Sequence, residues 1–83
     1  MEEAKRSVAN LQDEITKSTV SEAQQATLDD VALHIEKYQD DPDAHHETLR
    51  ERLEDALLEF GAEHHSLAES IRLAIYDLSN AGV

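Results

Sequence analysis

Four of the five histidines stand in two adjacent pairs, and imidazole is a common metal ligand and general base. The pairs are His45-His46 and His64-His65. A zinc site needs three or four ligands around one ion. Adjacent residues of a helix point about 100° apart, so one pair chelates an ion poorly. No two histidines have the i,i+3 or i,i+4 spacing that would place them on one helical face.

The two pairs flank a single predicted helix, which leaves two interpretations. A helix of about 16 residues holds its ends about 24 Å apart. The four imidazoles of one chain therefore cannot share an ion. In the first interpretation they are solvated residues at helix boundaries. In the second, the protein is metal-responsive, and His45 and His46 of one subunit meet His64 and His65 of the other across an antiparallel dimer.

Other catalytic arrangements receive little support from the sequence. Di-iron bundles use Glu-x-x-His motifs, and none occurs in the chain. Asp30 and His34 are four residues apart but lack a repeated partner, as does the pair Asp41 and His45 beside the proline. Ser66 adjoins a histidine that nothing orients as a catalytic base. There is no glycine-rich phosphate loop. We therefore expect no enzyme activity and no cofactor.

Four segments carry apolar residues at helical spacing and must position these side chains. The first two stripes contain Ala4, Val8, Leu11 and Ile15, then Leu28, Val31, Ala32, Ile35 and Tyr38. The third and fourth contain Leu49, Leu53, Ala56, Leu57 and Phe60, then Leu67, Ile71, Ala74, Ile75 and Leu78. Such stripes are typical of helices that bury one face in a bundle. They predict helices over approximately 2–18, 21–39, 43–60 and 66–81.

Boundary residues separate these helices. Ser21 begins an S-x-x-Q capping box and Ser66 begins an S-x-x-E box, so each is predicted to cap a helix. Pro42 cannot extend the preceding helix but suits the first turn of the next one. Gly61 stands where a left-handed residue often ends a helix.

The sequence thus predicts an all-α protein, an antiparallel up-down bundle of about four helices in a single domain over residues 1–83. Hairpins over 1–40 and 43–83 would compose it. An 83-residue chain buries only a small core. Four large apolar residues lie off the stripes, namely Leu33, Leu58, Leu73 and Tyr76. We expect them to complete the bundle by forming a homodimer interface.

The charge balance excludes several classes of partner. The chain has 19 acidic and 7 basic residues, a net charge of −12. Nucleic-acid binding needs a basic surface, and anionic membranes repel an acidic one. The excess is divided evenly along the chain and either keeps the protein soluble or steers an unidentified basic protein partner. Without cysteine, disulfides and thiolate metal sites are excluded. With no apolar run of transmembrane length and no signal peptide at Met1, we expect a cytoplasmic protein.

The C-terminal half resembles a known family. The segments HHETLRERLEDALLEF and EHHSLAESIRLAIYDLSNAGV, within residues 45–83, are similar to domain-of-unknown-function family 4404, a group of small bacterial proteins. That family often has proline where this chain has His65, which implies that a helix opens there. The resemblance implies a helical fold and a bacterial origin, but it brings no catalytic or binding residues. We expect a non-enzymatic protein-interaction or self-associating module, with the metal-responsive protein as the alternative.

Overall fold

Four helices make up the computed structural model, which describes residues 2–81. They are α1 (Glu2–Lys17), α2 (Glu22–Asp40), α3 (Pro42–Phe60) and α4 (His65–Ala81). Each predicted helix is present with its ends within about one residue of the expected positions. The prediction of an all-α, four-helix fold is therefore confirmed for the described part of the chain.

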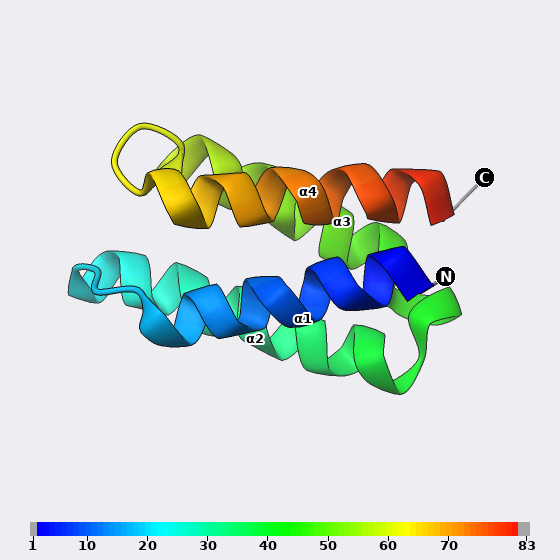
Figure 1. The fold of residues 1–83 in the computed structure, drawn as a ribbon. Coiled ribbons are helices and arrows are strands. Elements are labelled where there is room, and N and C mark those ends of the chain that lie inside the picture. The colour runs from blue at the N-terminus through cyan, green and yellow to red at the C-terminus, as the bar shows by residue number, and fades with distance from the viewer. Residues whose placement is uncertain (1, 82–83) are drawn as a thin grey trace.

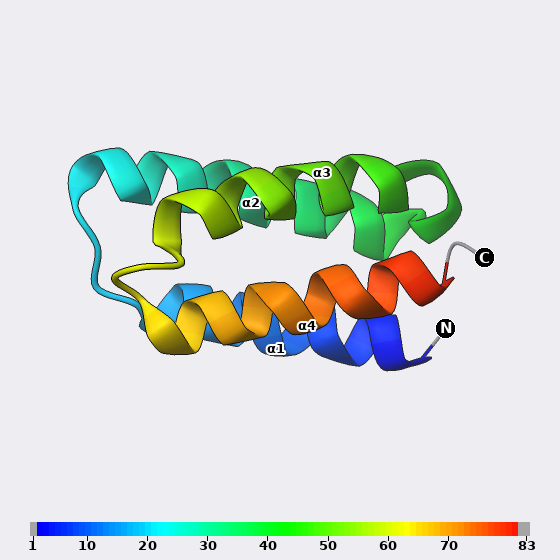
Figure 2. The ribbon, with the colours of Figure 1, turned by 90° about the horizontal axis from the view of Figure 1, so that it is seen from above.

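The helices run alternately up and down and form two layers (Figures 1 and 2). One layer contains α1 and α4, and the other contains α2 and α3. The α1–α2 and α3–α4 loops lie at one end of the bundle, and the α2–α3 turn lies at the other end with the chain termini (Figure 1). Helix α1 packs more extensively on α4 than on its sequence neighbour α2. The bundle measures 34 × 19 × 19 Å.

The core is built from the predicted stripes. Residues at the centre of each stripe are almost completely buried, including Val8, Ile35, Leu53 and Ile71. Residues on the shoulders of the stripes, such as Leu57 and Ile75, are only partly buried against this core. Ala68, which belongs to none of the predicted stripes, is also fully buried in the core. Burial of these apolar side chains is the main stabilising contribution, because the short loops add few contacts.

Local side-chain contacts explain how α2 and α3 begin. The hydroxyl of Ser21 accepts from the backbone N–H of Gln24, and the Gln24 side chain accepts from the backbone N–H of Ser21. This capping box was predicted and is confirmed. Asp41 alone connects α2 to α3, and its carboxylate accepts from the backbone N–H of Ala44. Pro42 follows as the first helical residue of α3, where its missing N–H needs no partner.

The predictions for the α3–α4 loop were wrong in two details. Gly61 has right-handed helical torsions (φ −59°, ψ −30°) rather than left-handed ones. Ser66 does not cap α4, because the helix already begins at His65 and Ser66 lies in its first turn. The first-turn N–H of Ala68 instead bonds to the carbonyl of His64. His65 thus occupies the opening position that the resemblance implied, and proline would fit there.

No helix in the described part of the chain is long and apolar enough to cross a membrane.

Candidate functional site

The first histidine pair lies in the opening turns of α3. His45 and His46 are both partly buried. His46 borders a shallow surface hollow that α3 shares with the C-terminal end of α4, lined also by Glu47, Arg50, Leu78 and Ser79. One imidazole with one carboxylate and one guanidinium beside it is a polar surface cluster, and it does not make a ligand set for zinc.

The second pair closes the α3–α4 loop at the other end of α3. The backbone N–H of His64 donates to the carbonyl of Phe60 at 3.0 Å, and the His64 carbonyl accepts from Ala68 at 2.8 Å. The His64 ring packs edge-on against Phe60, with 5.6 Å between ring centroids. His65 follows as the exposed first residue of α4. His64 therefore joins the last turn of one helix to the first turn of the next.

The structure does not bring the two pairs together within one chain. They stand at opposite ends of α3, whose 19 residues span about 28 Å. Among residues 2–81, no three histidine, aspartate or glutamate side chains are grouped so that they could hold a metal ion. Any metal site built from both pairs requires two copies of the chain.

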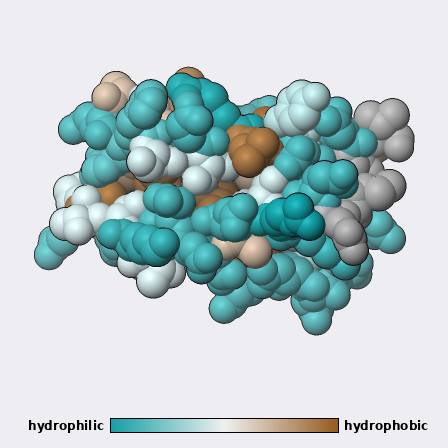
Figure 3. Space-filling model, viewed as in Figure 1, coloured by the Kyte–Doolittle hydropathy of each residue, from teal (hydrophilic) through white to brown (hydrophobic). Residues whose placement is uncertain are grey.

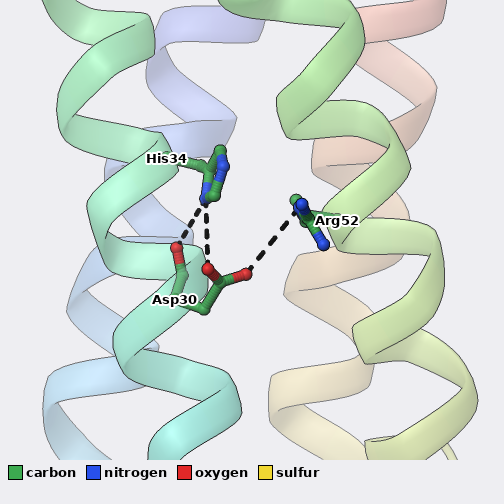
Figure 4. Close-up of polar contacts among 3 residues, drawn as sticks. All are labelled: Asp30, His34 and Arg52. Atoms are coloured by element: carbon green, nitrogen blue, oxygen red, sulfur yellow. Dashed lines mark hydrogen bonds and ion pairs between the residues drawn. The ribbon is translucent and has the colours of Figure 1, made fainter.

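Asp30 and His34, the other pair considered as candidates for chemistry, lie on α2 beside α3 (Figure 4). The His34 Nδ1 donates to the main-chain carbonyl of Asp30 at 2.8 Å and stands 3.7 Å from the Asp30 carboxylate. The Arg52 Nε on α3 lies 3.9 Å from the other carboxylate oxygen. No hydroxyl in the described chain hydrogen-bonds to His34, so the cluster lacks a nucleophile. It is a surface ion pair between two helices, and such pairs contribute at most about 1 kcal/mol.

The four off-stripe apolar residues are all exposed, as expected, but they do not form one surface. Leu33 lies on α2 and Leu58 on α3, with exposures of 48% and 87%. Leu73 and Tyr76 lie about one turn apart on α4 and are 51% and 65% exposed. Helices α2 and α4 are diagonally opposed in the bundle (Figure 2), so their exposed residues lie on different sides of it.

The outer surface of α4 therefore offers the most coherent candidate for binding. We call this surface, defined by Glu69, Arg72, Leu73 and Tyr76, the α4 face. A shallow hollow runs along it beside Glu69, Ser70, Arg72 and Leu73. Figure 3 shows a small hydrophobic spot over the middle of α4 and a hydrophobic strip between α4 and α1, within a largely hydrophilic surface. An apolar area rimmed by polar groups is typical of a protein interaction site.

A comparison with protein-family models identifies the family of the chain. The family model described as Domain of unknown function (DUF4404) matches residues 4–83. The chain belongs to this family. The match extends the resemblance from the C-terminal half to nearly the whole sequence, including α1 and α2. No curated protein and no solved structure matches the chain.

This DUF4404 chain has a polar contact between its first and last helices that sequence reasoning missed. The Ser7 hydroxyl donates to the Asp77 carboxylate, which joins α1 to α4 across 70 positions of sequence. Ser7 is 5% exposed and is the one buried polar residue in the described core. The sequence signal is its spacing, three residues after Ala4 and four before Leu11, which places it on the same side of the helix as the first stripe. The contact bridges α1 and α4 within their shared layer.

The charge of the DUF4404 chain is also distributed differently in space than along the sequence. Helices α2 and α3 carry 11 acidic and 3 basic residues, a net charge of −8. Helices α1 and α4 carry 6 acidic and 4 basic residues, a net charge of −2. The bundle therefore has one strongly acidic layer and one nearly neutral layer, and the α4 face belongs to the nearly neutral one.

Proposed function

We propose that the protein is a cytoplasmic, non-enzymatic protein-interaction module that binds through the α4 face. The observation that carries the proposal is the placement of Leu73 and Tyr76. Both are large, both are more than half exposed, and they lie about one turn apart on a helix of the nearly neutral layer. Tyrosine is enriched at interfaces because its ring packs against apolar groups while its hydroxyl stays hydrated.

The polar rim of the α4 face supports the same function. Arg72 and Glu69 lie beside the hollow next to Leu73. Arginine and tyrosine are both enriched among the residues that dominate binding energy at protein interfaces. The remaining surface of the bundle is more acidic and presents its large apolar side chains singly, as Leu33 and Leu58 illustrate. Single exposed apolar residues are normal on a protein surface.

A photo-crosslinking experiment in the native cell tests this proposal. A photoreactive phenylalanine analogue replaces Tyr76 in one variant and Leu58 in a matched variant. We expect a defined covalent adduct from position 76 and none from position 58, although Leu58 is the more exposed of the two residues. Adducts from both positions alike, or from neither, would contradict an interaction surface on α4.

A further inference from the structure

We infer that the partner bound by the α4 face is a second copy of this chain, paired through an antiparallel two-fold contact of α4 with α4. This inference rests on the proposed interaction surface and names its occupant. Three observations carry it, namely the charge of the two layers, the arrangement of the apolar pair and the size of the nearly neutral layer.

The charge distribution decides which partner suits which surface. A basic protein would be drawn to the layer formed by α2 and α3, which carries a net charge of −8. The layer formed by α1 and α4 carries only −2, so it offers a basic partner little attraction. The same low charge lets an identical acidic molecule approach from this side. A second copy meets the least electrostatic repulsion when the two nearly neutral layers face each other.

The apolar pair on α4 is self-complementary under two-fold symmetry. In a two-fold contact, the same patch on each copy covers the other. When an antiparallel pairing of α4 is centred between Leu73 and Tyr76, Leu73 of one copy lies level with Tyr76 of the other. Each copy then covers the exposed apolar side chains of its partner, and the polar side chains of Glu69 and Arg72 remain at the rim.

The nearly neutral layer offers an area at the lower end of the range for a stable contact. The bundle is 34 Å long and 19 Å wide, which gives one layer a projected area of about 650 Å². Stable interfaces bury about 600–1,000 Å² on each partner, so the contact would have to use most of this layer. Leu73 and Tyr76 would form the apolar centre of the contact, and neighbouring side chains of α1 and α4 its periphery.

Light scattering after size-exclusion chromatography measures the mass in solution. We expect the purified protein at micromolar concentration to show twice the chain mass of 9.3 kDa. The double variant Leu73→Glu/Tyr76→Glu should show the mass of one chain. The matched variant Leu58→Glu adds a charge at a still more exposed leucine on α3 and should remain a dimer. Circular dichroism verifies that all three proteins are equally helical.

The outcomes separate this inference from the proposed function. A monomeric wild-type mass at every concentration would overturn the pairing of two copies. Equal dissociation by Leu58→Glu would overturn the placement of the contact on α4. If the protein is monomeric while position 76 still crosslinks to a different protein in the cell, the interaction surface stands and its occupant is not a second copy. If position 76 yields no adduct and the protein is monomeric, both proposals fail.

Discussion

Replacing Ser7 by alanine is expected to destabilise the bundle, because it removes the buried polar contact between α1 and α4. The Ser7 hydroxyl is buried and donates to Asp77, which is only partly buried. A hydrogen bond to a charged group contributes about 1.5–3 kcal/mol. Water can reach the Asp77 carboxylate, so we take the lower end of that range. Alanine is also a better helix former than serine by a few tenths of a kcal/mol. The net loss should therefore be about 1 kcal/mol.

Urea unfolding followed by circular dichroism gives this free energy directly. For a domain of this size, 1 kcal/mol corresponds to a fall in Tm of about 4–8 °C. Thr27→Ala is the matched control, because the Thr27 hydroxyl donates to the Glu59 carboxylate at 3.0 Å, between α2 and α3, but at an exposed position. Its effect should stay within about 0.5 kcal/mol.

A double-mutant cycle tests whether Ser7 acts through Asp77. If the two side chains are coupled, Ser7→Ala should cost much less in an Asp77→Ala background than in the wild-type protein. In the Ser7→Ala variant, hydrogen exchange should accelerate more in α1 and α4 than in α2 and α3. The reason is that the lost contact joins only α1 and α4. Equal losses from Ser7→Ala in both backgrounds would refute the assignment of the stabilisation to this contact.

Three further predictions concern the loop, the core tyrosine and the histidines. Gly61→Ala should lower the free energy of unfolding in urea by about 1 kcal/mol, because a Cβ at this position would lie 2.7 Å from the Leu57 carbonyl oxygen. An unchanged free energy of unfolding would contradict this. Burial raises the pKa of Tyr38 in the folded protein above its ordinary 10.0. The stabilisation that depends on a neutral Tyr38 is therefore present below pH 10 and should be lost as the pH rises through the pKa of the folded protein. Tyr38→Phe should abolish this alkaline loss of Tm, and Tyr76→Phe, which leaves one tyrosine, should retain it. Zinc should leave Tm unchanged, and a rise that both His45→Ala and His64→Ala remove, each alone, would instead establish the metal-responsive alternative.

The helices and most of the core could be predicted because their signals are local. Large aliphatic residues recur at three- and four-residue intervals, and that period alone specifies which face of each helix is buried. The caps at Ser21 and Asp41 are equally local, since each side chain accepts from a backbone N–H three residues further along the chain. These features depend on no knowledge of which helices are neighbours.

The features that could not be predicted depend on the spatial neighbours of each residue. Ser7 is polar and Ala68 is small, so neither was assigned to a stripe, but both are buried in the folded bundle. The torsions of Gly61 are set by the loop that closes onto α4, because glycine itself permits many conformations. The start of α4 one residue before Ser66 likewise follows from the chain path through His64, which the capping pattern does not encode.

The charge shows most clearly how topology creates a property that the sequence does not display. Each half of the chain holds one nearly neutral helix and one acidic helix, so the excess charge looks evenly divided. The single-residue connection at Asp41 folds the two acidic helices against each other and produces one acidic layer.

This asymmetry favours one orientation for self-association. In a pair joined through α4, the acidic outer surfaces would lie roughly 38 Å apart, twice the thickness of one bundle, and far beyond the screening length of about 8 Å at physiological ionic strength. Such a dimer should therefore depend only weakly on salt. A pair joined through α2 and α3 would bring the two acidic layers into contact and would need high salt to form. The salt dependence of the measured mass thus identifies the layer that carries the contact, even without a variant.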